Sequence, residues 1–517
     1  MRQSTRLILN TLATYIRMFV TVGLGLYATR LASHALGAQD FGIWANLSAV
    51  AAILYVLSDG LTESAVRSLA FELGKPDHGR LRAVFSTTAA LFAGMGLLAL
   101  LVGLPLGYLA VSAIKGLPDA RFAPALWSWC FIIGAVALSI ASMPYRALFT
   151  ARQRIFVLTV ADTLDSVLRL AAIVIAASLQ TDTADRLVWL CGLTLIGTLI
   201  TTLAVLVLSL RASPDAIPRI RDCSRALVRE IAGYSFWAIV GNLSYRVRLA
   251  GPPLILGANF GPLVNAAYAY ASQIAGYQIT VASAVSRATQ PAVVTATGRE
   301  DRPRILQLIS LVNKYSVFIA LFYLVPIMLE TPTVLRLWLG DRADAADPLF
   351  VRLVMATLGI PWVYMGYHLA ISATGRISRY MTIAVISEII ALAGSLIAVR
   401  WLGAPAWAVC AISAGTVSLF TLIYVAHISR VLHLSLAHWF TGTWVPVLTV
   451  ALPSLAAAGL TRSLLPEGWP RLLAVAITYA LVALPLIWFL GMAHDERGHF
   501  SRIFTSGLHR LRRPAAA

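Results

Sequence analysis

The chain has 517 residues, of which 59% are hydrophobic and only 12% are charged, and its mean hydropathy is +0.78. Soluble proteins have roughly 45–50% apolar and about 25% charged residues, so this composition excludes an ordinary water-soluble domain. It indicates a chain whose main solvent is lipid. The net charge is +18, and all but three of the 41 basic residues are arginine. In a membrane protein, an excess of positive charge first indicates basic cytoplasmic loops. No nucleic-acid partner is predicted, because no aromatic residues interleave with the basic ones.

About fourteen transmembrane helices are predicted, because about 20 apolar residues are needed to cross a hydrocarbon core of roughly 30 Å. The chain is therefore expected to be an all-α polytopic membrane protein. The predicted segments are, in chain order, 7–30, 41–62, 83–111, 122–144, 155–179, 187–210, 231–257, 263–286, 305–329, 349–373, 379–399, 405–428, 442–464 and 472–493.

Arginine and lysine are concentrated in the loops on the side of the N-terminus. By the positive-inside rule, this bias predicts that both termini are cytoplasmic. The two most basic segments, 211–229 and 497–513, lie on that side. The connecting loops are too short for a soluble catalytic domain, so the chain is predicted not to be an enzyme. No nucleotide-binding or zinc motif is found, and no cofactor or metal is predicted.

Short sequences recur in the same order about 220 residues apart. Leu36-Gly37-Ala38 returns as Leu256-Gly257-Ala258, and Phe41-Gly42 returns as Phe260-Gly261. The offset contains six predicted spans, so the two copies would have the same orientation, as in transporters built from parallel repeats. We predict two six-helix lobes at 1–210 and 231–430, joined by a basic cytoplasmic linker at 211–230. A helix pair at 431–493 and a basic tail at 494–517 follow.

Several charged residues fall inside the predicted spans, where each costs about 2.5–3.5 kcal/mol on insertion scales unless it faces water or a partner. Arg246 and Arg248 lie near the middle of one span, Arg17 in the middle of the first, and Lys314 two to three turns into another. These four are the candidate binding residues for an anionic substrate. Arg246 and Arg248 point about 200° apart on a regular helix, which disfavours both facing one cavity, but a helix distorted near Gly251-Pro252-Pro253 would remove that objection.

Acidic residues are the candidates for gating or for coupling to a cation. Asp162 and Asp165 share one helix face with Arg169, and Asp165 can either pair with that arginine or face a cavity. Glu388 has no charged neighbour in its span, which favours a coupling role. A further cluster, expected to form interfacial pairs or to gate the cytoplasmic mouth, consists of Asp59, Glu63 and Arg67.

The stretch from Thr29-Arg30-Leu31 through Leu36-Gly37-Ala38 to Asp40-Phe41-Gly42 resembles the opening motif of the polysaccharide-transporter flippases. Arg30, Gly37 and Gly42 carry this motif. Ser58-Asp59-Gly60-Leu61, followed by Arg67, is similar to a second element of the family. These are the Wzx-type flippases for repeat units of O-antigen, capsule and exopolysaccharide, in the MOP superfamily of multidrug antiporters and lipid II flippases.

The resemblance implies a bacterial inner-membrane protein that moves undecaprenyl-diphosphate-linked oligosaccharide from the cytoplasmic to the periplasmic leaflet. It implies alternating access through a cavity between two lobes, with arginines such as Arg17, Arg246 and Arg248 holding the diphosphate. Membrane lipid is an expected partner. A polysaccharide polymerase, chain-length proteins and a coupling ion, H⁺ or Na⁺, are left open. The chain departs from the family in having Val247, where family members often carry an acid before the basic residue.

Two alternatives remain open. The first is another transporter of the same superfamily: a lipid II flippase would need the same arginines, whereas a drug or cation antiporter should have a more acidic cavity. The second is an enzyme. A membrane glycosyltransferase, polymerase or ligase would need catalytic groups in an external loop. The longest candidate loop is 330–352, whose acids, Asp341, Asp344 and Asp347, are predicted to be ordinary solvated charges.

Overall fold

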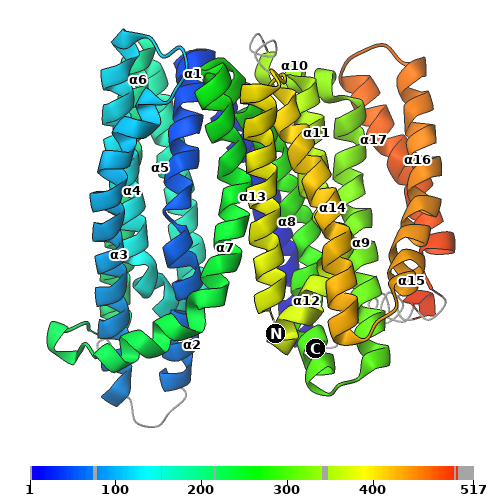
Figure 1. The fold of residues 1–517 in the computed structure, drawn as a ribbon, viewed down its shortest axis with the longest axis horizontal. Coiled ribbons are helices and arrows are strands. Elements are labelled where there is room, and N and C mark those ends of the chain that lie inside the picture. Colours follow the sequence, from blue (N-terminus) through cyan, green and yellow to red (C-terminus); the bar gives the residue numbers. More distant parts are fainter. Residues whose placement is uncertain are drawn as a thin grey trace, which may run out of the picture. The chain divides into compact units, whose positions relative to one another are not determined.

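The computed structural model describes residues 3–73, 79–152, 154–213, 217–340, 347–375, 377–493 and 496–498. The side chains of 3–21, 57, 59, 63, 79, 155, 220 and 230–241 lie outside that description. All regular secondary structure in the described residues is helical, which confirms the predicted all-α class (Figure 1).

The chain divides into two compact units. The first comprises Met1–Gln273, Trp338–Phe350 and Met381–Thr416, and the second comprises Ile274–Leu337, Val351–Tyr380 and Val417–Ala517. The lobes predicted at 1–210 and 231–430 stay a prediction.

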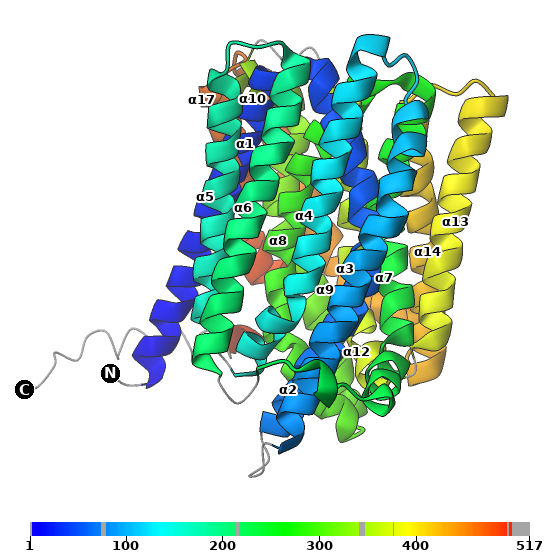
Figure 2. The ribbon, with the colours of Figure 1, turned by 90° about the vertical axis from the view of Figure 1, so that its left-hand side faces the viewer.

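The first unit is built mainly from the N-terminal helices. α4 (Asp119–Ala151) packs along both α3 (Gly79–Ser112) and α6 (Thr183–Ala212), and α6 packs along α5 (Ile155–Ser178). Figure 2 shows these four helices running alongside α1 (Gln3–Ile53). α2 (Val56–Leu73) contacts α7 (Arg225–Phe260), and a single turn of 3-10 helix, Ile220–Asp222, precedes α7.

The second unit is organised around α9 (Arg302–Leu329), which packs against α12 (Met365–Thr374), α16 (Val445–Leu464) and α17 (Trp469–Leu486). α9 begins after Asp301, whose carboxylate accepts a hydrogen bond from the Arg304 N–H, and Pro303 occupies its first turn. α16 and α17 lie side by side (Figure 1). The remaining elements of this unit are α10 (Thr331–Leu339), α11 (Pro348–Gly359), the 3-10 helix Ile360–Tyr364, α15 (Leu436–Trp439) and π-helices at Phe440–Trp444 and Ile487–Gly491.

Three helices contribute to both units. They are α8 (Pro262–Gly298), α13 (Ser378–Trp401) and α14 (Trp407–Leu432), which are divided after Gln273, Tyr380 and Thr416 respectively.

Nine helical segments in the described residues are long and apolar enough to cross a membrane, and they coincide with nine of the predicted spans. They bear large exposed apolar side chains, such as Leu101 of α3 and Leu481 of α17, which suit a lipid environment. The other five predicted segments lie on α1, α2, α5, α7 and α8, and the segment at 41–62 contains the two-residue turn between α1 and α2. A total of fourteen membrane crossings stays a prediction.

Two glycines form matching corners between long helices. Gly37 interrupts α1 with φ 74° and ψ 167°, and Gly261 separates α7 from α8 with φ 87° and ψ −175°. Only glycine adopts this conformation without strain. The same corner therefore occurs twice, 224 residues apart (261 − 37), which is close to the predicted repeat offset. The sequence matches, in contrast, pair Gly37 with Gly257 and Gly42 with Gly261.

Two other glycines of the repeated motif allow close approach between helices. A Cβ on Gly42 would lie 1.9 Å from the carbonyl oxygen of Pro262, and a Cβ on Gly257 would lie 1.9 Å from Nδ2 of Asn46. The structure therefore explains why glycine occupies both motif positions: Gly37 has a positive φ angle, and Gly42 lies against Pro262. Arg30, the third motif residue, is exposed on α1.

Candidate functional site

The mid-span arginine Arg248 of α7 forms an ion pair with Glu388 of α13. Its Nε donates to Glu388 Oε1 at 2.7 Å, and its Nη2 lies 2.5 Å from the same oxygen. Both side chains are largely buried, with 14% of Arg248 and 5% of Glu388 exposed. Glu388 is the one carboxylate of its predicted span, and its ion-pair partner comes from a helix 140 residues earlier in the chain. Its role in coupling stays a prediction.

The surroundings of Glu388 explain why it points at α7. Ile386, Ile389 and Ile390 of α13 are exposed, and Glu388 lies on the other side of the helix from Ile386 and Ile390. One turn further along both helices, Leu392 occupies space against Gly251, where a Cβ would lie 2.4 Å from the leucine Cδ2. A glycine on α7 therefore lets α13 come close enough for the ion pair to form.

Arg246 has a different environment from Arg248, as their angular separation predicts. Its guanidinium carbon lies 5.6 Å from the ring centre of Tyr55, a cation–π distance. Tyr55 lies in the short turn at Leu54–Tyr55 that separates α1 from α2. Discontinuous helices are typical of transporter binding sites, so a turn beside an arginine is consistent with such a site. Hydropathy alone did not predict this turn.

Three of the predicted residues lie on the first two helices. Arg17 lies on α1 and Asp59 and Glu63 lie on α2, but their side chains are outside the described residues. Arg67 is exposed on α2. The roles assigned to these four stay predictions.

The acidic residues of α5 form two separate ion pairs. Asp165 accepts a hydrogen bond from Arg169 at 2.7 Å, and both side chains are partly exposed. This i, i+4 pair is one of the two arrangements that the sequence left open for Asp165. Asp162 pairs instead with Arg146 of α4. The two carboxylates therefore each have a basic partner, although they share a helix face.

Lys314 of α9 is buried, with 6% of its side chain exposed, and its Nζ donates to Glu496 Oε2 at 2.7 Å. The same oxygen accepts from the Tyr315 hydroxyl at 3.2 Å and from the Ala493 N–H at 2.8 Å. Glu496 follows α17 and was not predicted to take part in any site. The segment after the last helix thus supplies the counter-ion of a buried lysine.

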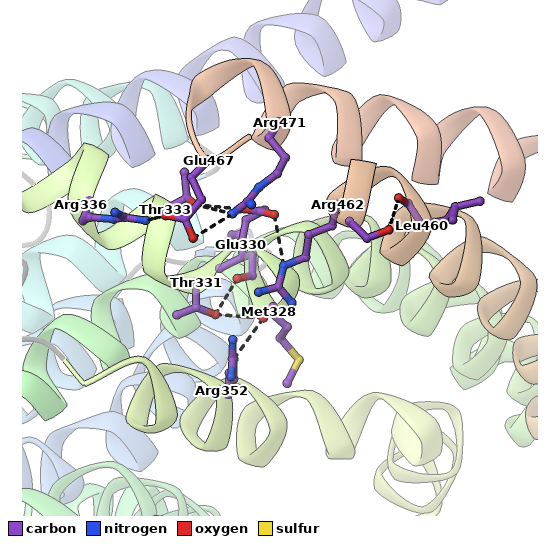
Figure 3. Close-up of polar contacts among 12 residues, drawn as sticks. Met328, Glu330, Thr331, Thr333, Arg336, Arg352, Leu460, Arg462, Glu467 and Arg471 are labelled. Carbon is purple, nitrogen blue, oxygen red and sulfur yellow. Dashed lines mark hydrogen bonds and ion pairs between the residues drawn. The ribbon is translucent and has the colours of Figure 1, made fainter. Parts of the chain in front are cut away.

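A second buried network surrounds Glu330 at the end of α9 (Figure 3). The Glu330 carboxylate is fully buried and accepts hydrogen bonds from Arg471 Nη2 at 2.8 Å and from Thr333 Oγ1 at 2.7 Å. Arg462 Nε lies 3.5 Å from its other oxygen. Glu330 begins the predicted loop 330–352 but is buried, because α10 and the ends of α16 and α17 enclose it. Asp341 and Asp344 of that loop lie outside the described residues.

Glu467 extends the network toward the surface, where it pairs with Arg336 and lies 3.6 Å from Arg471 (Figure 3). Arg352 donates to the carbonyl oxygen of Met328 at 3.1 Å. These contacts join the start of α17 to α10 and the start of α11 to the end of α9.

Of the charged groups described, Arg246 and Arg248 offer the arrangement best suited to a ligand. Two guanidinium groups lie at neighbouring positions in the middle of α7, one over an aromatic ring and one held by a carboxylate. Guanidinium binds phosphate and carboxylate oxygens through paired hydrogen bonds, so this region is the candidate for an anion site.

No protein-family model and no curated protein sequence matches the chain. Solved structures do match its fold. A multidrug-resistance MATE family transporter of the MOP superfamily, in an inward-facing conformation, matches with a TM-score of 0.63 and 15% identity, covering 80% of this chain and 98% of that one. The lipid II flippase MurJ matches with a TM-score of 0.66 and 13% identity, covering 97% and 99%. A MOP superfamily transporter from Pyrococcus furiosus matches with a TM-score of 0.58 and 15% identity, covering 81% and 95%.

The chain therefore has the fold of the MATE and MurJ transporters of the MOP superfamily. It is a multi-pass membrane protein, as its apolar helices also indicate.

Proposed function

We propose that the protein is a flippase that moves undecaprenyl-diphosphate-linked oligosaccharide repeat units from the cytoplasmic to the periplasmic leaflet. It acts in the bacterial inner membrane, with both termini in the cytoplasm. The headgroup crosses by alternating access through a cationic cavity while the polyprenyl tail stays in lipid. No bond is broken, so the protein is a transporter and not an enzyme.

The observation that carries this proposal is the pair of arginines in the middle of α7. A buried guanidinium is costly and is retained where it pairs or binds, and the diphosphate of a lipid carrier is the anion that this membrane protein would meet. Arg248 and Arg246 would contact the diphosphate, and Arg17 and Lys314 are the further candidates. The sequence motif at Arg30, Gly37 and Gly42 supports the polysaccharide branch of the superfamily.

The second candidate is transport of lipid II, which carries the same diphosphate. The extent of the structural match favours it over drug transport, because MurJ spans 97% of the chain whereas the MATE structures span about four fifths. A cationic drug would also be repelled by arginines at mid-span.

The experiment is a flipping assay with the purified protein in liposomes. A fluorescent undecaprenyl-diphosphate oligosaccharide, fluorescent lipid II and a cationic dye are tested in parallel, with protein-free liposomes as the control. We expect protein-dependent flipping of the oligosaccharide lipid. Flipping of lipid II alone would establish the second candidate, and uptake of the dye alone would contradict both.

A further inference from the structure

The contact between Arg248 and Glu388 uses the part of the guanidinium that binds oxyanions best. Nε and Nη2 form one edge of the group, and both lie within 2.7 Å of a single oxygen, Oε1 of Glu388. Oxygens of a phosphate bind to the same edge through two parallel hydrogen bonds. Glu388 therefore occupies a position that an incoming phosphate would need.

Burial explains why such a partner is required in the absence of substrate. An unpaired arginine at this depth would be strongly destabilising, whereas a hydrogen-bonded carboxylate neutralises it. A carboxylate facing lipid would carry a comparable cost, and Glu388 is directed away from the exposed faces at Ile386 and Ile390. The two charges thus stabilise each other in a region that neither would occupy alone.

The ion pair joins two helices that lie far apart in the sequence. Gly251 and Leu392 pack one turn away and fix the distance between α7 and α13. Packing between α7 and α13 therefore holds the Glu388 carboxylate beside Arg248.

We propose that Glu388 is the internal counter-ion of Arg248 and is exchanged for a phosphate of the substrate during each transport cycle. This inference rests on the proposed function and adds a specificity-determining residue to it. A substrate must bring enough negative charge to displace the carboxylate, so the site selects diphosphate-bearing lipids over neutral ones. After release of the headgroup, Glu388 pairs with Arg248 again.

The test is binding of farnesyl diphosphate, a short soluble analogue of the carrier, to the purified protein. Glu388→Gln keeps the size of the side chain but removes the competing charge, so we expect the dissociation constant to fall about tenfold. In the same variant we expect slower flipping at saturating substrate, because the headgroup leaves Arg248 less readily. Asp119→Asn, which removes an exposed carboxylate at the start of α4, is the matched control and should change neither quantity.

A purely structural role for Glu388 predicts unchanged or weaker binding in Glu388→Gln, and that result would overturn the inference. If that variant does not fold, the wild-type protein provides a second readout. Labelling of Glu388 by a hydrophobic carbodiimide, followed by mass spectrometry, should increase when farnesyl diphosphate binds. Unchanged labelling at saturating ligand would equally overturn it.

Failure of the proposed function gives a different pattern. If neither the wild type nor Glu388→Gln binds farnesyl diphosphate, the anion site itself is absent and the inference falls with it. If the wild type binds and flips but Glu388→Gln gains no affinity, only the role of Glu388 is lost.

Discussion

Glu330 at the end of α9 accepts a hydrogen bond of 2.8 Å from Arg471 at the start of α17, and neither side chain is appreciably exposed. Removing the charge of Glu330 leaves Arg471 buried without its main counter-ion. Breaking a buried pair in this way typically costs about 3–5 kcal/mol. We therefore expect Glu330→Gln to lower the thermal unfolding temperature of the purified protein in detergent by several degrees.

The matched control for this substitution is Glu467→Gln, because Glu467 is more than half exposed and pairs with Arg336 at the surface. Surface ion pairs contribute about 0–1 kcal/mol, so its effect should be small. Equal unfolding temperatures for the two variants would contradict a stabilising role for the buried pair.

Gly42 and Pro262 provide a second test of packing. Gly42→Ala would place a methyl group 1.9 Å from a backbone oxygen that belongs to a different helix, so we expect a large loss of folded protein. Gly23→Ala is the control, since it makes the same change in the same helix where no atom lies within 4 Å. Size-exclusion chromatography of detergent-solubilised protein measures the difference, and comparable yields of the two variants would show that the approach of α1 and α8 is not needed for folding.

Lys314 and Glu496 allow the contribution of one buried pair to be isolated. Glu496→Gln leaves the ammonium of Lys314 without its counter-ion, and we expect destabilisation by about 3–5 kcal/mol. Adding Lys314→Met should recover most of this loss, because the uncompensated charge is then gone. The free energies of unfolding of the wild type, both single variants and the double variant form a double-mutant cycle. Strictly additive effects of the two substitutions would mean that the two residues do not interact.

The positions of the helices could be predicted because hydropathy reports directly on burial in lipid. The predicted spans coincide with helical segments, except that 41–62 contains the turn at Leu54–Tyr55. Some ends differ by a few residues, as at α7, which begins at Arg225 where the prediction began at 231, whereas α8 continues to Gly298 where the prediction ended at 286. The turn at Leu54–Tyr55 was missed because the residues around it are as apolar as those of an unbroken span. α10 was assigned to a loop because its nine residues are too short to give a transmembrane signal.

The partners of the charged residues were harder to predict. Asp165 and Arg169 could be paired because they are one helical turn apart. Arg248 and Glu388 could not, since their contact depends on how α7 and α13 pack and sequence spacing carries no information on that. The same holds for Lys314, whose counter-ion lies beyond the last predicted span.

In the proposed mechanism, arginines within the helices bind the diphosphate of a lipid-linked oligosaccharide. The most direct test compares flipping of the fluorescent undecaprenyl-diphosphate oligosaccharide by the wild type, Arg17→Ala, Arg246→Ala and Arg248→Ala, each first shown to insert and fold. Arg400→Ala, at the exposed end of α13, is the control for loss of one positive charge.

A hydrogen bond between charged groups contributes about 1.5–3 kcal/mol, so we expect flipping by Arg248→Ala to fall at least about tenfold, with Arg246→Ala also impaired and Arg400→Ala unchanged. Normal flipping by well-folded Arg17→Ala, Arg246→Ala and Arg248→Ala would contradict the account.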